Sequence, residues 1–196
     1  MWEQCPDRHY QPHETSQVDI LIVPGLRNSG PDHWQTRWQQ KLSTAKCVDM
    51  GNWERPHLAD WRERLVRAVN AAERPVVLVA HSLGVVMVAH AAPEFEPGKV
   101  VGAYLVAMAD VEDTTRSSPE THNFAPIPRE PLPFETVMVA SRNDPHAAWT
   151  RSETIANQWG AKFEDAGEAG HINADSGQGP WPEGLLSFAR FMSRLG

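Results

Sequence analysis

The segment that most constrains the fold is residues 76–92, with the sequence VVLVAHSLGVVMVAHAA. Its first five residues form a continuous apolar run, which predicts a buried strand, and residues 83–92 form an almost wholly apolar helix. Elements that are apolar on all sides must be covered on both faces. The segment is too short for a membrane span and carries polar side chains such as Ser82. We therefore expect a strand, a tight turn and a helix at the centre of a covered sheet.

The rest of the chain alternates in the same way. Apolar runs predict three more strands, at residues 18–23, 100–108 and 135–141. A short, weakly marked strand is expected at residues 46–50 and a last strand at residues 161–165. Helical periodicity predicts four more helices, the first with Pro31 in its first turn, at residues 31–42, 58–73, 147–159 and 183–195. Strands that alternate with helices favour an α/β fold with a parallel sheet and helices on both of its faces.

Two segments depart from this alternation. Residues 1–17 are polar and contain two prolines, so we expect an N-terminal tail ahead of a single domain over residues 18–196. Residues 110–133 hold five prolines and form a long connection, where we expect an excursion that faces substrate. A chain of 196 residues is long enough for one core of ordinary size.

The turn after the strongest strand has the properties of a nucleophile elbow. Ser82 stands between a strand and a helix, and the residues two positions before and after it, Ala80 and Gly84, are small enough for a very tight turn. Such a turn raises the serine hydroxyl above the sheet edge. It also places the N–H of Leu83 at a helix N-terminus, where it can donate to a developing oxyanion. The alternative, a serine at a strand end by chance, fits this context less well. His81 is expected to point away from the cleft as a packed side chain.

A serine nucleophile needs a base, and His171 is the best candidate. It lies just past the last predicted strand, in a loop rich in glycine, and catalytic groups of an α/β sheet gather at the carboxyl ends of strands. The other histidines are less directly placed. His9 and His13 are in the tail, His90 is on the buried helix, and four follow no strand end as directly: His33, His57, His122 and His146.

The base in turn needs a carboxylate to orient it. Asp144 follows the fifth predicted strand, which gives the chain order serine, aspartate, histidine that is expected on an α/β sheet with an elbow. An aspartate before a proline is also a common turn residue, so a purely structural role stays open. Asp110, after the fourth predicted strand, is the rival for the same role.

A second oxyanion donor is expected in the loop after the first strand. We assign it to the N–H of Leu26, since Gly25 lets the backbone approach the substrate closely, although a simple strand-ending turn explains the loop nearly as well. The sequence has no grouping of metal ligands at the usual spacing and no glycine loop for phosphate. No cofactor and no metal are expected.

Charge and cysteine content bear on partners and compartment. The formal net charge of −7 disfavours nucleic acid and anionic membranes as partners. Two cysteines, Cys5 and Cys47, are too few for a disulfide framework, and no basic start precedes an apolar run as in a signal peptide. We expect a cytoplasmic protein that acts on a small-molecule acyl substrate; a protein partner is unknown.

The motifs together resemble a known family. VPGLRNSGPDHWQTRW, VAHSLG, FAPIPREPLPF followed by SRNDP, and GHINADSGQGPWPEG are similar to segments of the small serine hydrolases typified by retinoblastoma-binding protein nine and its bacterial relatives. The resemblance covers nearly the whole chain from Val18. It implies a three-layer α/β-hydrolase fold with no large cap and six parallel strands in the order 2-1-3-4-5-6. It also implies a triad of Ser82, Asp144 and His171. Ala80 replaces the glycine usual in that family.

The predicted function is therefore that of a serine hydrolase. It would cleave an ester-like or amide-like substrate through a covalent acyl-enzyme, most simply as a carboxylesterase, while thioesterase, amidase and aminopeptidase activities share the same machinery. Trp34 and Phe124 are candidate walls of the substrate site, although core packing explains them about as well. The alternative is a binding protein that keeps the hydrolase scaffold and works through a partner surface.

Overall fold

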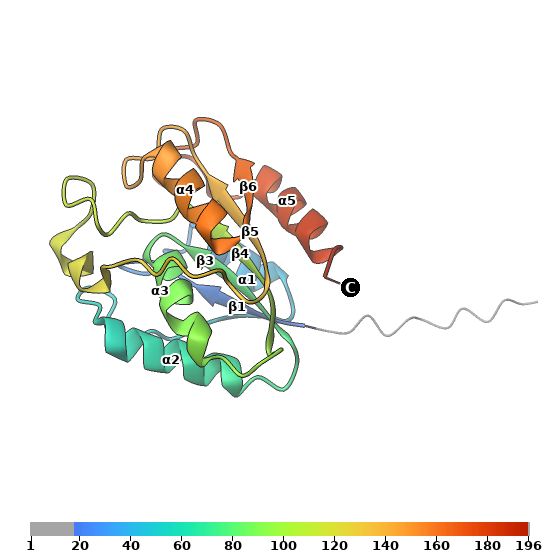
Figure 1. Ribbon diagram of the computed structural model, residues 1–196. Coiled ribbons are helices and arrows are strands. Elements are labelled where there is room, and N and C mark those ends of the chain that lie inside the picture. The colour runs from blue at the N-terminus through green and yellow to red at the C-terminus, as the bar shows by residue number, and fades with distance from the viewer. Residues whose placement is uncertain (1–17, 196) are drawn as a thin grey trace, which may run out of the picture.

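The sheet determines the architecture. The computed structural model describes residues 18–195, so the predicted tail at 1–17 lies outside the described residues. Six strands pair in parallel in the order β2-β1-β3-β4-β5-β6, as predicted (Figure 1). Their bounds are β1 (Asp19–Val23), β2 (Ala45–Cys47), β3 (Val76–His81), β4 (Val100–Val106), β5 (Glu135–Ala140) and β6 (Lys162–Asp165).

Helices cover both faces of this sheet, which confirms the predicted layers. The helices are α1 (Trp34–Lys41), α2 (Leu58–Asn70), α3 (Leu83–Ala91), α4 (Trp149–Trp159) and α5 (Pro182–Met192), with short 3₁₀ helices η1 (Ala92–Glu94) and η2 (Pro119–Phe124). Buried side chains of α2, α3 and α4 share one core cluster, and those of α1 and α5 share another. Figure 1 shows α2, α3 and α4 grouped apart from α5 across the strands.

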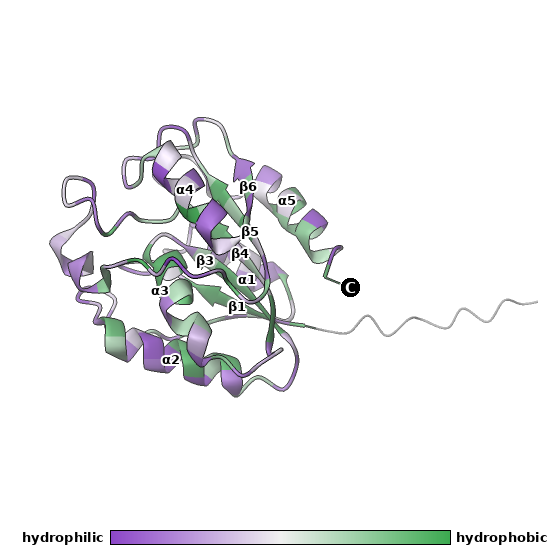
Figure 2. Ribbon diagram, in the orientation of Figure 1, coloured by the Kyte–Doolittle hydropathy of each residue, from purple (hydrophilic) through white to green (hydrophobic). Residues whose placement is uncertain are grey.

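The central strands are apolar on both sides because each side meets one of these clusters, whereas the edge strand β6 is polar and partly exposed. In β1, Leu21 and Val23 join the cluster of α2, α3 and α4, whereas Ile20 and Ile22 join that of α1 and α5. Neighbouring residues of a strand point to opposite faces, so a sheet buried twice needs an unbroken apolar run. Figure 2 shows the central strands in green, β6 at the edge in purple and the outer helices as mixed.

Several predicted ends are wrong by a few residues, and the first helix is the instructive case. It begins at Trp34 instead of at Pro31, because His33 acts as its N-cap: the ring Nδ1 accepts a hydrogen bond from the N–H of Gln35 at 3.1 Å. Pro31 lies ahead of the helix in the approach loop. Likewise β4 ends at Val106 and not at residue 108, because Ala107 leaves the extended region with a φ of 50°.

The long connection over residues 110–133 folds back onto the sheet. The indole of Trp159 donates to the carbonyl of Pro128 at 2.8 Å, and Leu132 N–H donates to the carbonyl of Trp159. The Arg151 side chain of α4 pairs with both Asp110 and Glu112. The Arg151 pairs fasten the start of the connection, and the Trp159 bonds fasten its return to the start of β5. Between residues 18 and 195, no helix combines the length and apolar character that a bilayer span needs.

Candidate active site

The turn between β3 and α3 has the strained backbone of an elbow. Ser82 has a φ of 56° and a ψ of −122°, a conformation that costs a residue with a side chain on the order of 1–3 kcal/mol. Close packing on both sides holds it: a Cβ on Gly25 would lie 2.8 Å from the Ser82 Cβ, and one on Gly84 would lie 2.3 Å from the carbonyl oxygen of Val23. The strain lifts the Ser82 hydroxyl into a cleft at the carboxyl edge of the sheet.

Three side chains from distant parts of the chain meet there. The His171 Nε2 lies 2.8 Å from the Ser82 Oγ, and its Nδ1 lies 2.9 Å and 3.0 Å from the two carboxylate oxygens of Asp144. Because the carboxylate can only accept, Nδ1 carries the proton and Nε2 presents its lone pair to the hydroxyl. This arrangement can take a proton from Ser82 and hold the resulting imidazolium.

The loop that carries His171 is tied down on several sides. The carbonyl oxygen of His171 lies 2.9 Å from the His81 Nε2. The indole of Trp34 donates to the carbonyl of Ile172 at 2.8 Å. At its start, Ala169 N–H donates to the Ser141 Oγ at 2.9 Å. A base held through its own backbone keeps its ring direction without help from the substrate.

Asp110 does not meet His171, so the structure separates the two rival carboxylates. Its side chain accepts from the Nε of Arg151 at 3.1 Å and from the N–H of Glu112 at 3.2 Å. Its role in the structure is to fasten the connection over residues 110–133. Asp144, by contrast, is buried against His171 and accepts a further bond from the N–H of His146 at 2.8 Å.

The two residues predicted to supply oxyanion donors line the cleft that holds Ser82. Leu83 is the first residue of α3 and Leu26 follows Gly25, and both line the cleft with Ser82. Throughout residues 18–195, neither N–H is the donor of a hydrogen bond to another group. The N-terminal N–H groups of a helix are free by construction and carry its positive dipole end. Both predicted oxyanion donors therefore remain available.

The cleft has a volume of about 540 Å³ and walls that combine polar and apolar groups. Ser117, Ser118 and Thr121 contribute to it, so the 110–133 connection does face the site, as expected. Sequence reasoning missed two further wall residues, His33 and His146. The His146 ring packs edge-on against that of His171 with centroids 4.4 Å apart. Its position directly after Asp144-Pro145 was the signal that could have found it.

The predicted wall residues Trp34 and Phe124 do not line this cleft, and that prediction is wrong. Both are fully buried in the core. Trp34 packs between Trp38 and Trp181, where its indole anchors the His171 loop, and Phe124 packs edge-on against Trp61. Their aromatic surface is used for packing under the site, which was the alternative explanation.

Burial shifts the pKa of two side chains that could otherwise be mistaken for reactive groups. His81 is buried as predicted, and burial together with the neighbouring charge of His171 sets its pKa well below the ordinary value. Cys47 is not a rival nucleophile, because burial and the charge of Asp49 raise the pKa of its thiol to about 11.

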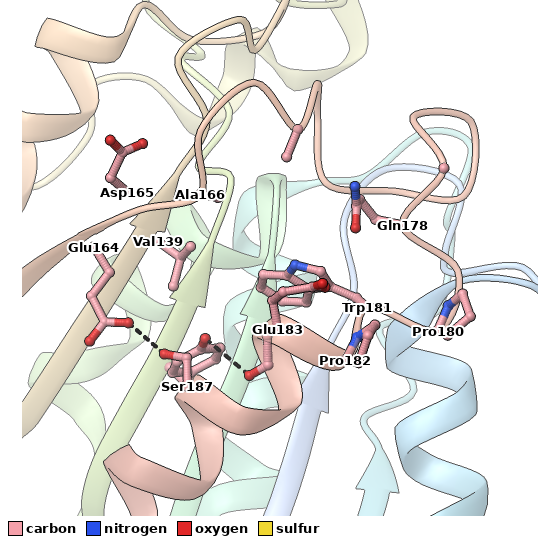
Figure 3. Close-up of a pocket in the computed structure, with 14 residues that line it drawn as sticks. Val139, Glu164, Asp165, Ala166, Gln178, Pro180, Trp181, Pro182, Glu183 and Ser187 are labelled. Carbon is pink, nitrogen blue, oxygen red and sulfur yellow. Dashed lines mark hydrogen bonds between the residues drawn. The ribbon is translucent and has the colours of Figure 1, made fainter.

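A second cavity of about 560 Å³ lies beside β6 and the start of α5 (Figure 3). Figure 3 shows Glu164 bonded to Ser187, with Trp181 and Pro182 forming the adjacent wall. The buried Tyr104 hydroxyl donates to the carbonyl of Gly184 at 3.3 Å. Ser82, Asp144 and His171 do not line this second cavity.

The chain is similar to known hydrolases in both sequence and structure. The sequence model described as "Serine hydrolase" matches residues 20–190. YdeN of Bacillus subtilis (strain 168) is 22% identical over 170 residues, which cover 81% of this chain and 87% of that protein. The crystal structure of a YdeN-like hydrolase from Pectobacterium atrosepticum is 33% identical, with a TM-score of 0.80 over 91% of this chain and 92% of that one. The structure of the B. subtilis ydeN gene product is 20% identical and shares the fold, with a TM-score of 0.74. The match covers 90% of this chain and 100% of that one.

Proposed function

The chain belongs to the serine hydrolase family, as its resemblance to the retinoblastoma-binding protein nine group predicted, and from this premise we propose that it hydrolyses small acyl esters through Ser82. The observation that carries the proposal is the continuous chain of contacts from the Asp144 carboxylate through His171 to the Ser82 hydroxyl. Amides and thioesters react by the same steps, and esters are proposed first because their leaving groups depart more easily.

The reaction runs in two halves. In the first, the Ser82 Oγ bonds to the substrate carbonyl carbon while its proton passes to Nε2 of His171. The N–H groups of Leu83 and Leu26 stabilise the oxyanion, and Asp144 stabilises the imidazolium. The tetrahedral intermediate then expels the alcohol, which takes its proton from His171 and leaves an acyl-enzyme.

Water completes the cycle in the second half. His171 takes a proton from a water molecule, whose oxygen bonds to the acyl carbon, and then returns that proton to the departing Ser82 Oγ. The carboxylic acid is released and the free serine is restored. All proton transfers use side chains already on the chain, and none needs a cofactor.

Hydrolysis of p-nitrophenyl acetate, compared between wild type and Ser82→Ala, tests this proposal. We expect turnover in the wild type and a loss of roughly three orders of magnitude or more in Ser82→Ala, because the nucleophile is gone. Ser193→Ala removes an exposed serine on the C-terminal side of α5 and serves as the matched control, with wild-type turnover expected. A parallel panel with a thioester and an amide ranks the other leaving groups.

The alternative function, a binding protein with a dispensable site, is one outcome of the same experiment. If Ser82→Ala hydrolyses esters as fast as wild type, Ser82 is not the nucleophile and the proposal fails. If the wild type hydrolyses none of the three substrate types, the result favours a binding protein that works through a partner surface.

A further inference from the structure

His33 lies in the wall of the cleft and is not used by the triad. It caps α1, is 7% exposed, and lines the same cleft as Ser82 and His171. Its ring meets the His81 ring edge-on at 4.8 Å, and the His81 ring in turn lies 4.9 Å from that of His171. The imidazole is therefore held close to the reacting groups by aromatic packing as well as by its own helix.

The helix cap fixes which nitrogen of His33 carries the proton. Because Nδ1 accepts from the N–H of Gln35 at 3.1 Å, the neutral ring has its hydrogen on Nε2. Burial and the charge of His171 lower the pKa of His33 to about 4, so the ring stays neutral at physiological pH. Across the described part of the chain, 18–195, Nε2 has no hydrogen-bond partner. The ring thus offers an unused N–H donor.

Three hydroxyl donors in the cleft wall are already engaged. Arg27, Asn28 and Asn173 also bring side-chain N–H groups to the cleft, but they are less buried than the His33 ring. The Ser117 hydroxyl donates to the carbonyl of Asp113 at 2.8 Å, and the Thr121 hydroxyl donates to the carbonyl of Ser118 at 2.8 Å. The Ser118 hydroxyl is bonded to Glu120. A substrate oxygen that enters the cleft would find these hydroxyl protons occupied, whereas the His33 N–H is free to donate.

We propose that His33 is a substrate-binding residue whose Nε2–H donates a hydrogen bond to an oxygen that the acyl group carries near the scissile carbonyl. The preferred substrates are then short acyl compounds with an ether, hydroxyl or keto oxygen beside that carbonyl, and plain hydrocarbon acyl chains are poorer substrates. The inference rests on the proposed function, since Ser82 must attack the carbonyl. It adds the chemical class of the acyl group and the residue that recognises it.

Two substitutions separate recognition from the helix cap. Ser is as good an N-cap as any residue, so His33→Ser keeps an oxygen acceptor for the N–H of Gln35 while removing the ring donor. His33→Ala removes both the acceptor and the donor. Both variants lose the packing of the ring, so the difference between their melting temperatures reports what loss of the cap alone does to folding.

The test uses two esters of equal length, p-nitrophenyl methoxyacetate and p-nitrophenyl butyrate, which differ by an ether oxygen in place of a methylene. Each kcat/KM is divided by the ester's rate with hydroxide, which removes the difference in intrinsic reactivity. We expect the wild type to prefer the methoxyacetate by roughly fivefold to tenfold, the value of one neutral hydrogen bond. In His33→Ser the corrected ratio should fall to about one, because the methoxyacetate loses a hydrogen bond that the butyrate never makes.

Three outcomes would overturn the inference. An equal ratio for wild type and His33→Ser means that His33 does not recognise the oxygen. An equal loss on both esters means that the ring only supports the fold. If neither ester is hydrolysed and Ser82 stays unlabelled by a fluorophosphonate, the proposed function has failed as well. Labelling of Ser82 at wild-type rate in His33→Ser distinguishes the first case from the last.

Discussion

At the scale of single residues, the decisive distinction lies between two buried aspartates that follow neighbouring strands. Asp144 contacts the His171 ring, whereas Asp110 contacts Arg151. Both are similarly inaccessible, at 7% and 6% exposed, so burial alone does not separate them. The partner of each carboxylate does, because only Asp144 can set the tautomer of the base.

Exchange of each carboxylate for an amide should therefore affect different properties: activity for Asp144 and stability for Asp110. Asp144→Asn is expected to cut kcat for p-nitrophenyl acetate by roughly 10³- to 10⁴-fold, because an amide stabilises the wrong tautomer of His171. Asp110→Asn should keep kcat within about tenfold and instead lower the free energy of unfolding by roughly 1–3 kcal/mol, through its lost pair with Arg151. Initial rates and urea unfolding measure the two effects. The reverse pattern would assign the acid to Asp110.

At the scale of elements, the elbow depends on how closely α3 approaches the end of β1. Gly84 is the point of contact, since its added Cβ would meet two backbone carbonyl oxygens, those of Val23 and Pro24, at 2.3 Å and 2.7 Å. Backbone atoms cannot turn aside as a side chain can. The approach also keeps the loop with Leu26 beside Leu83, so that one packing contact aligns both oxyanion donors.

Gly84→Ala tests this contact. An alanine in a helix ordinarily gains up to about 1 kcal/mol over glycine, but here we expect the free energy of unfolding to fall by roughly 1–3 kcal/mol as α3 is forced outward. Gly30→Ala is the matched control, since a Cβ there meets nothing within 4 Å and the free energy should change by about 0.5 kcal/mol or less. Chemical denaturation of both variants measures the difference. A Gly84→Ala protein as stable as wild type would mean that the approach is not tight.

The elements were predictable to the extent that burial determines them. Strands such as β1 and β3 are apolar on both faces, and their sequence runs show it directly. The start of α1 was not predictable, because a histidine ring rather than a common capping residue ends the loop before it. Trp34 was assigned to the wrong surface for a related reason: helix periodicity shows that Trp34 and Trp38 share a face, but not whether that face meets the sheet or the cleft.

At the scale of the whole molecule, the parallel sheet brings the distant parts of the site together. Ser82 and His171 are 89 positions apart, and both stand at carboxyl ends of strands, which gather at one edge. That much of the site follows from chain order and topology. The cleft walls do not, because His33 and His146 are placed by loop conformations, with Arg27 and Asn28 at positive φ in the first loop. The expected lack of nucleic-acid and membrane partners, and the cytoplasmic location, stay predictions.

The central claim is that the fold assembles an activated serine at position 82, and intact mass after exposure to a fluorophosphonate tests it most directly. Phosphonylation needs a serine with a working base, and it needs no knowledge of the natural substrate. We predict a single adduct that peptide mapping places on Ser82, absent in Ser82→Ala and formed far more slowly in His171→Ala. An unmodified protein at neutral and mildly basic pH, or an adduct on another residue, would contradict the account.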